Sequence, residues 1–533
     1  MVRFQDAPRA QTVEPHAGAA HFVGRLRQVF GAAWRPAFAW KTGLFIAIAV
    51  GGILLRLRYS GFLETFEDPY QNWWISANTL QTGRYLDPFS MMTHGNWLPL
   101  YHFFGAGLLA IAGLRNFEAL KLGNIAISTV TATLVFAVGR RRSSFAGFAA
   151  LAFFSFNLID IAVSGEATAE ELAAFLVFLS YAFTFVLQDS VRWSLAIAAT
   201  ALLFATMTRY EAWLAVILLV AYALVSQPKA PSRKALLLVA SPAILFMIAY
   251  FTYALQWGFL PELVVRQTST DIQYQLSVGT QRSPIQILYL WWAAYVSFFP
   301  LVFAIGGLYA AWTSRREFAS WIIISLWGFT VVYTVLQFGN PSFRYVLLTV
   351  PFLSLMAASG LEGLVRHFVG AGNPKVAVKQ RATWYVAAVG AIVIVGTMLP
   401  APAAYWQSGF PSSRYMEPLV NAGLFLSNRP LPAGKILLTE SPISAYYSGY
   451  PPDRMLGSRY LAASRSAALA FIEQNVAYVV YVGVPYYTLR TLFPELQNGT
   501  STPNFLLLYD AGGPQVGWHA VYVYAVVTNA SAF

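Results

Sequence analysis

Apolar stretches close to membrane-spanning length, separated by short polar segments, recur along the first 400 residues. A helix needs about 20 apolar residues to cross the hydrocarbon layer of a bilayer. The runs that approach this length lie at 42–57, 119–138, 145–163, 169–187, 193–208, 211–226, 235–257, 286–311, 319–337, 344–366 and 383–400. The segment "PLYHFFGAGLLAIAGL" at 99–114 is ambiguous. This pattern predicts a mainly α-helical, polytopic membrane protein.

The pattern changes after Pro400. The stretch "APAAYWQSGFPSSRY" at 401–415 is rich in Pro, Ser and Gly, as is typical of a linker. Strand-like runs follow at 435–440, 477–484, 505–510 and 520–527, with a helical stretch near 461–475. We therefore expect a small α/β domain over residues 401–533.

Composition agrees with a membrane protein, because 57% of the 533 residues are hydrophobic and only 11% are charged. Soluble proteins carry roughly 25% charged residues. The net charge of +12 could indicate nucleic-acid binding. The basic residues, however, fall in clusters between apolar runs, as the positive-inside rule describes, so we expect no nucleic-acid partner. The sequence has no cysteine, which excludes disulfides and thiolate metal sites.

The basic clusters also predict the orientation. If 99–114 spans the membrane, the cluster Arg140, Arg141 and Arg142 lies outside; if it stays at the interface or dips in and returns, every basic cluster lies inside. The second arrangement gives about eleven spans within a transmembrane domain at 41–400. Residues 1–40 then form a cytoplasmic tail, and residues 401–533 and the first loop, 58–118, lie outside.

Acidic residues mark three segments on this outer face: the loop 58–118, the turn 164–172 and the loop 258–285. "FEDPYQNWW" at 66–74 contains Glu67 and Asp68 beside Pro69, which can cap an interfacial helix or form a site. The length and aromatic content of its loop favour a site. "SGEATAEEL" at 164–172 places Glu166 and Glu170 four residues apart, so we expect them on one helix face.

Arginines occur at the same face. "TRYEAW" contains Arg209, Tyr210 and Glu211 at a short turn, and "NPSFRY" contains Arg344 and Tyr345 at the start of another run. Charged groups so close to lipid often mark substrate paths. Guanidinium groups bind phosphate oxygens in bidentate fashion, which suits a lipid-linked phosphate.

Two histidines lie in the first outer loop. His94 and His102 are eight residues apart, and either can serve as a ligand. Interfacial hydrogen bonding is the more common role of such histidines, and we favour that interpretation.

Together these motifs resemble the glycosyltransferase C (GT-C) superfamily. "FEDPY" is similar to the first-loop acidic motif of oligosaccharyltransferase catalytic subunits and protein O-mannosyltransferase-like enzymes, and "WLPLYHFF" resembles a "PPLYYW" stretch of bacterial family-39-like and aminoarabinose-transferase-like members. "SGEATAEEL" resembles a turn that assigns the matching acid to Glu170. The resemblance covers about residues 40–365. The "WWD" signature of oligosaccharyltransferases is missing, which argues against transfer of an oligosaccharide to asparagine.

The resemblance implies an inverting hexosyl- or pentosyltransferase in the plasma (inner) membrane of a prokaryote. Its partners would be membrane lipid, a polyprenyl-phosphate-linked sugar and an acceptor, which can be lipid, protein or glycan. A transporter or flippase is the alternative, but such proteins typically show internal repeats and broken helices at the bilayer midplane.

The resemblance also implies roles for the residues. Asp68 is the expected base and Glu67 the second candidate, while Glu170 orients the acceptor. Asp68 and Glu170 can also share Mg²⁺ or Mn²⁺. The donor phosphate is expected at Arg209, Arg344 and Tyr345, with Glu211 holding Arg209. Supporting positions are Tyr210, His94 and His102.

Overall fold

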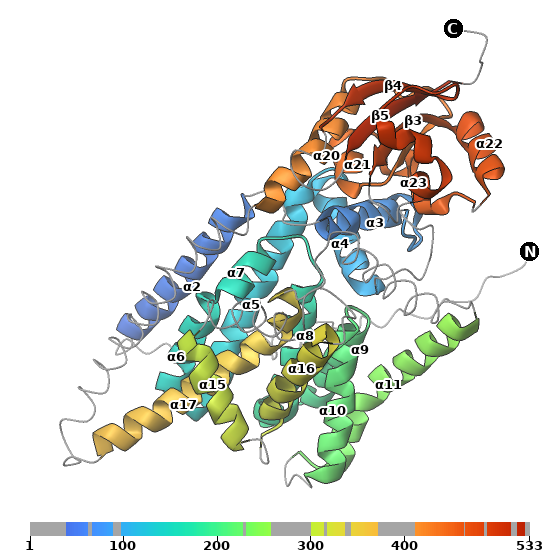
Figure 1. Ribbon diagram of the computed structural model, residues 1–533. Coiled ribbons are helices and arrows are strands. Elements are labelled where there is room, and N and C mark those ends of the chain that lie inside the picture. The colour runs from blue at the N-terminus through green and yellow to red at the C-terminus, as the bar shows by residue number, and fades with distance from the viewer. Residues whose placement is uncertain are drawn as a thin grey trace, which may run out of the picture. The chain divides into compact units, whose positions relative to one another are not determined.

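The protein is described by a computed structural model (Figure 1). The described residues are 39–61, 67–88, 98–226, 231–256, 300–313, 317–335, 343–370, 411–462, 464–483, 488–512 and 520–527. The chain divides into two units, Met1–Val50 and Gly51–Phe533.

The helices of the apolar part coincide with the predicted runs. They are α2 (Ala39–Ser60), α5 (Phe117–Arg142), α6 (Ser144–Ser155), α7 (Leu158–Ser164), α8 (Glu170–Tyr181), α9 (Ser194–Thr206), α10 (Glu211–Val225), α11 (Arg233–Gln256), α15 (Pro300–Thr313), α16 (Phe318–Val335) and α17 (Val350–Gly370). Short helical segments η2 (Ala182–Val186), η3 (Gln188–Ser190) and η5 (Phe343–Thr349) extend or precede them. The predicted run at 383–400 lies outside the described residues, and so does the part 286–299 of the run at 286–311.

The described helices are those of an integral membrane protein. Four of them are long and apolar enough to cross a bilayer by length and composition: Lys41–Ser60, Phe117–Arg142, Arg233–Gln256 and Leu347–Leu364. The bent pair α6–α7 makes a fifth candidate. Shorter apolar helices occur at Pro99–Ala112, Ser194–Thr206, Glu211–Val225 and Phe318–Gly328. The count of about eleven spans stays a prediction.

The run at 145–163 is not one straight helix, contrary to its continuous apolar pattern. Helices α6 and α7 meet at an angle of 54°. The side chain of Asn157 causes the break, because its Oδ1 accepts hydrogen bonds from the backbone N–H groups of Ile159 and Asp160, 2.9 and 3.2 Å away. Such an N-cap starts a new helix in the middle of an apolar run.

The first outer loop contains two helices, α3 (Asp68–Thr82) and α4 (Pro99–Ala112). Helix α3 has Pro69 in its first turn and ends at Gly83, whose φ of 67° is a conformation that glycine adopts easily. Helix α4 has 14 residues, so it is about 21 Å long, less than the ~30 Å of the hydrocarbon layer. The helices α9 and α10 are equally short, with 13 and 15 residues, so the interfacial or re-entrant interpretation of 99–114 stays a prediction.

The C-terminal part folds around a five-stranded sheet in the order β2-β1-β3-β5-β4. The strands are β1 (Ile436–Thr439), β2 (Met455–Gly457), β3 (Val476–Val482), β4 (Phe505–Asp510) and β5 (Val521–Val526). Strands β1, β2 and β3 are parallel, with Leu438 opposite Leu456 and Val479, whereas β5 is antiparallel to β3 and β4.

Helices surround this sheet: α20 (Pro411–Ser427), α21 (Pro442–Tyr447), α22 (Arg465–Asn475), α23 (Thr488–Leu492), η6 (Pro452–Arg454), η7 (Ser458–Tyr460) and η8 (Pro494–Asn498). The prediction of a linker over the whole of 401–415 is wrong at its end, because α20 begins at Pro411. Proline is favourable at the start of a helix, so the Pro and Ser residues that suggested a linker begin a helix instead.

Helix α3 packs into the core on one side of the sheet. Its Tyr70, Trp73 and Trp74 belong to one buried cluster with Leu437 and Val480. The alternate strand residues face a second cluster on the other side, as the period of a strand requires. The indole Nε1 of Trp74 also donates to the carbonyl of Pro452 at 3.2 Å, and the N–H of Gly457 donates to the carbonyl of Pro88 at 3.0 Å. The sheet therefore holds the helix that begins at Asp68.

Candidate functional site

Four of the predicted site residues meet although they lie far apart in the sequence. The Nη1 atom of Arg344 lies 2.6 Å from Asp68 Oδ2, and the Nε atom of Arg344 lies 3.5 Å from Glu170 Oε1. The Nη1 atom of Arg209 lies 3.1 Å from the same Glu170 oxygen. Glu170 is thus bridged by two guanidinium groups that come from η5 and from the turn before α10.

We name these residues together with Glu211 the Arg344 cluster: Asp68, Glu170, Arg209, Glu211 and Arg344. Their side chains differ in solvent exposure. The side chain of Glu170 is 2% exposed, whereas Asp68 is 27% exposed. The cluster therefore has a buried side at Glu170 and a side open to the surroundings at Asp68.

Glu211 binds Arg209 through a bidentate pair of hydrogen bonds. Arg209 Nε donates to Glu211 Oε2 at 3.0 Å, and Arg209 Nη2 donates to Glu211 Oε1 at 2.5 Å. Such bidentate pairs fix the plane of the guanidinium. The remaining nitrogen of the Arg209 guanidinium, Nη1, is the one that pairs with Glu170.

Glu67 and Asp68 point to different partners. Ser441 Oγ donates to Glu67 Oε1 at 3.0 Å, whereas Asp68 pairs with Arg344. Glu67 occupies the N-cap position of α3 but makes no side-chain cap hydrogen bond there. Of the two acids that the sequence left as alternatives, Asp68 is the one in the Arg344 cluster.

Glu170 and Glu166 do not share a helix face, so that prediction is wrong. Helix α8 begins at Glu170, and Glu166 lies in the preceding turn. The turn is held by two buried asparagines. Asn72 Nδ2 donates to the carbonyl of Ala167 at 2.9 Å, and Asn124 Nδ2 donates to the carbonyls of Glu166 and Thr168 at 2.7 and 2.8 Å.

These asparagines were not found from the sequence. Each satisfies backbone carbonyls that a buried turn would otherwise leave without donors. Asparagine within a helix has no periodic signal, so only the three-dimensional arrangement reveals the role. The consequence is a fixed backbone directly before Glu170.

Tyrosine hydroxyls line the neighbourhood of Arg209. Tyr210 and Tyr250 share a hydrogen bond of 2.8 Å between their hydroxyl oxygens. The ring of Tyr85 stacks on His102, with 5.6 Å between ring centroids. Burial, with Asp87 and Tyr250 nearby, raises the pKa of Tyr85 well above its ordinary value, so its hydroxyl stays protonated at neutral pH.

The other predicted supporting residues are only partly described. His102 is buried and packs against Tyr85. His94 lies outside the described residues, and so does the side chain of Tyr345, although its backbone belongs to η5.

A metal shared by Asp68 and Glu170 does not fit the observed contacts. Arg344 pairs with both carboxylates and supplies the positive charge that a cation would bring. Within the described ranges, no group of three or more His, Asp or Glu side chains is arranged to hold a metal ion. No chemical step is therefore assigned to Mg²⁺ or Mn²⁺.

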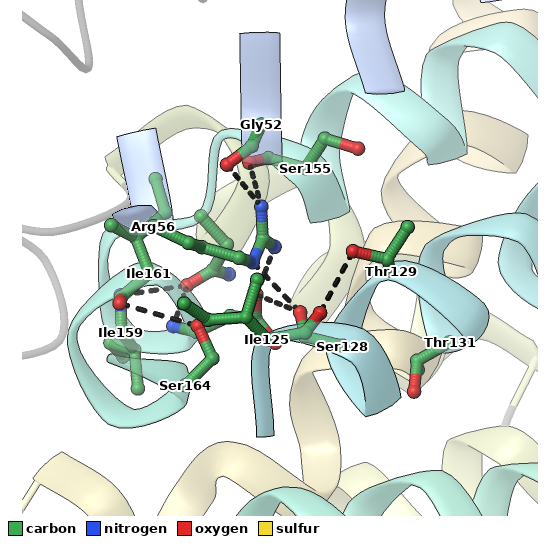
Figure 2. A network of polar contacts seen from close by, with 12 residues as sticks. Gly52, Arg56, Ile125, Ser128, Thr129, Thr131, Ser155, Ile159, Ile161 and Ser164 are labelled. Atoms are coloured by element: carbon green, nitrogen blue, oxygen red, sulfur yellow. Dashed lines mark hydrogen bonds and ion pairs between the residues drawn. The ribbon is translucent and has the colours of Figure 1, made fainter. Parts of the chain in front are cut away.

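A second arginine–acid cluster is completely buried among the helices. Figure 2 shows Arg56 between Gly52, Ser155 and Ser128, with donor–acceptor distances of 2.8 to 3.0 Å. Arg56 also pairs with Asp160, and Ser128 Oγ donates to Asp160 Oδ2 at 2.8 Å. We name these residues the Arg56 cluster: Gly52, Arg56, Ser128, Ser155 and Asp160. The sequence held a signal for it, since Arg56 and Asp160 are charged residues within apolar runs.

The chain has the fold of the GT-C membrane glycosyltransferases. ArnT from Cupriavidus metallidurans superposes with a TM-score of 0.54 in the apo state and 0.55 when bound to undecaprenyl phosphate, at 13% and 14% identity. Each match covers 93% of this chain and 99% of that chain. The fold implied by the sequence motifs is confirmed.

A second relative in structure is the archaeal oligosaccharyltransferase AglB from Archaeoglobus fulgidus, in complex with an inhibitory peptide and a dolichol-phosphate. Its TM-score is 0.52 at 12% identity, and the match covers 90% of this chain and 80% of that chain. No protein-family model matches the sequence, and no curated protein is found to be similar to it. The similarity is thus one of fold.

Proposed function

We propose that the protein transfers a sugar from a polyprenyl-phosphate donor to an acceptor at the outer membrane face, with inversion. The observation that carries this proposal is the bridging of Glu170 by Arg209 and Arg344, with Asp68 at the open side. Two adjacent guanidinium groups suit a phosphate, and an adjacent carboxylate suits a base. The fold shared with ArnT bound to undecaprenyl phosphate supports a lipid-linked donor.

Donor binding exchanges partners within the Arg344 cluster. The phosphate oxygens of the donor bind Arg344 and Arg209, and Arg344 then releases Asp68. Glu211 keeps Arg209 oriented through its two hydrogen bonds. The exchange frees the carboxylate of Asp68 to accept a proton.

Transfer then needs one proton movement and one substitution at carbon. The acceptor hydroxyl gives its proton to Asp68, and its oxygen forms a bond to the anomeric carbon of the sugar. The bond from that carbon to the phosphate oxygen breaks, and the leaving polyprenyl phosphate takes the electron pair. Arg209 and Arg344 stabilise the negative charge that develops on this phosphate.

The proposed setting is the inner membrane of a prokaryote, with residues 1–40 in the cytoplasm and residues 401–533 outside. The distribution of basic residues supports this orientation. A tag placed next to Arg140, Arg141 and Arg142 should be accessible only from the cytoplasm. Labelling of this tag from outside would overturn the orientation.

The test of function uses membranes that contain the wild-type protein or Asp68→Asn. Each is incubated with polyprenyl-phosphate hexose or pentose radiolabelled in the sugar, and loss of label from the lipid is followed. We expect Asp68→Asn to lower turnover by about 10²–10⁴-fold, the usual contribution of a general base.

Glu67→Gln is the matched control, because it neutralises the adjacent acid and keeps an oxygen that can accept from Ser441. It should retain most of the activity. Normal turnover by Asp68→Asn excludes Asp68 as the base. A wild-type protein that releases no sugar from either donor argues for transport instead.

A further inference from the structure

A side-chain hydrogen bond from Ser441 to Glu67 links the sheet to the start of α3 across 374 positions of the sequence. Ser441 lies two residues after Thr439, the last residue of β1, and its side chain is fully buried. A buried hydroxyl that donates to a carboxylate is a strong, directional contact. This contact reaches the residue next to the proposed base.

Ser441 is itself held on three sides. Its N–H donates to Thr439 Oγ1 at 3.0 Å, and Thr439 Oγ1 donates to the Ser441 carbonyl at 3.1 Å. Its Oγ accepts from the N–H of Ile443 at 3.2 Å as the N-cap of α21. The Ser441 hydroxyl thus donates its one proton to Glu67 while its oxygen accepts from the helix.

Glu67 belongs to the first turn of α3. Its carbonyl accepts from the N–H groups of Tyr70 and Gln71 at 3.0 and 3.1 Å, so its backbone is part of that turn. Adjacent residues on a helix point about 100° apart. When the side chain of Glu67 is fixed on Ser441, the direction of Asp68 toward Arg344 is fixed as well.

We infer that Ser441 is a positioning residue for the base, acting through Glu67, and that the sheet thereby sets the place of Asp68. The inference rests on the proposed function only for the role of Asp68 as base. Glu67 is then a positioning residue too, which explains why two adjacent acids occur in "FEDPY". Ser441 does not contact the reacting atoms.

Four variants test this role in the transfer assay. Ser441→Ala removes the bond and should lower kcat about 10- to 100-fold, the cost of displacing a catalytic group by ~1 Å, with KM for the donor changed less than about twofold. Ser441→Thr keeps the hydroxyl and should restore activity. Ser441→Asp keeps a good N-cap acceptor but repels Glu67, so it should be as slow as Ser441→Ala.

Ser444→Ala is the matched fourth variant. Ser444 is also fully buried and lies one turn further along α21, but its Oγ donates to the carbonyl of Leu419 at 2.8 Å and not to Glu67. It should lose comparable stability and keep kcat. If Ser441→Asp is as active as wild type, or Ser444→Ala is as slow as Ser441→Ala, the role of Ser441 is structural and the inference is wrong.

A geometric measurement keeps the inference testable whatever the protein transfers. The chain has no cysteine, so Asp68→Cys and Arg344→Cys create the only thiols in the full-length protein. A short bifunctional thiol reagent should link them several-fold more slowly when Ser441→Ala is added, and at an unchanged rate when Ser444→Ala is added. Equal rates in both backgrounds overturn the inference, even where the wild-type protein proves to be a transferase. Slower linking together with an inactive wild type leaves the positioning intact and removes the proposed function.

Discussion

The Arg56 cluster and the Arg344 cluster each contain an arginine–aspartate pair but differ in how deeply that pair is buried. Arg56 and Asp160 are 2% and 0% exposed, and four protein groups surround the guanidinium. Arg344 and Asp68 are 14% and 27% exposed, and their pair opens to one side. Burying a charge is costly unless hydrogen bonds compensate it.

This difference in burial indicates a structural role for the Arg56 cluster and a substrate-binding role for the Arg344 cluster. The guanidinium of Arg56 is paired with four buried protein groups, so the Arg56 cluster is best suited to join α2, α5 and α7. The Arg344 cluster can exchange a carboxylate for another anion at little cost. Helix α8 connects the two, because Glu170 faces the Arg344 cluster while the neighbouring Glu171 lies fully buried near Asp160.

The strongest test of the comparison removes one arginine from each cluster. Arg56→Leu leaves Asp160 buried without its cation and should lower the free energy of unfolding by about 3–5 kcal/mol. Arg344→Leu should cost about 1 kcal/mol, because Glu170 keeps Arg209 and Asp68 is partly hydrated. Thermal unfolding in detergent measures both.

The double variant Arg56→Leu with Asp160→Leu serves as the control for this test. Replacing a buried pair by apolar side chains is often neutral, so much of the loss should return. Equal losses for Arg56→Leu and Arg344→Leu would contradict the separation into structural and functional clusters.

The second prediction, smaller in expected effect, concerns a substitution in the Arg344 cluster alone. Arg344→Lys keeps the charge but cannot reach Asp68 and Glu170 through two separate nitrogens. Loss of one charge-assisted hydrogen bond, about 1.5–3 kcal/mol, should lower kcat/KM roughly 10- to 100-fold with an unchanged melting temperature.

Arg142→Lys provides the comparison, since Arg142 pairs with Glu317 at 3.0 Å and is 42% exposed. Exposed pairs contribute about 0–1 kcal/mol, so this variant should behave as wild type. Similar losses from both substitutions would mean that Arg344 has no special role.

The helices were predictable because long apolar runs have few alternatives in a membrane. The strands at 436–439, 476–482, 505–510 and 521–526 were also expected, since their apolar runs are bounded by turn residues. The three-residue strand β2 and the six-residue helix α21 were not, because segments so short have no period to detect. The break at Asn157 was missed for another reason: one capping side chain overrides the hydropathy of its neighbours.

In the site, sequence reasoning named Asp68, Glu170, Arg209 and Arg344 from the resemblance and from their common face, and the structure brings them together. It named Asp68 as the expected base and Glu67 as the second candidate, and this assignment stays a prediction. It could not foresee the partners of these acids, Arg344 and Ser441, because they lie hundreds of residues away. The asparagines 72 and 124 were missed because their partners are backbone carbonyls, which every sequence provides.

Glu440 differs from the acids of both clusters, because its buried carboxylate is held by hydrogen bonds from backbone N–H groups and a hydroxyl. Its carboxylate oxygens accept from the N–H groups of Val482 and Leu489 at 3.1 and 2.8 Å and from Ser458 Oγ at 3.2 Å. Burial nevertheless raises the pKa of Glu440 to about 8, above its ordinary value of 4.5. The folded protein therefore holds a proton that the unfolded chain releases between these two pH values.

The sign of the pH dependence follows from this proton. The stabilisation is complete below about pH 4.5 and is lost as the pH rises toward 8, by about 1.4 kcal/mol per pH unit. Glu440→Gln should remove this slope from the unfolding free energy measured at several pH values. A slope that is the same in wild type and variant would show that Glu440 does not cause it.

The smallest expected effect is that of removing divalent metal. Arg344 already lies against Asp68 and Glu170, so the cluster has its positive charge without an ion. We expect EDTA to change turnover by less than about twofold, ~0.4 kcal/mol. A loss above tenfold that Mg²⁺ or Mn²⁺ restores would mean that both carboxylates leave Arg344 to bind the ion. Arg344 would then be able to bind phosphate before the donor arrives. The two clusters would differ further, because only the Arg344 cluster could rearrange its ion pairs in this way.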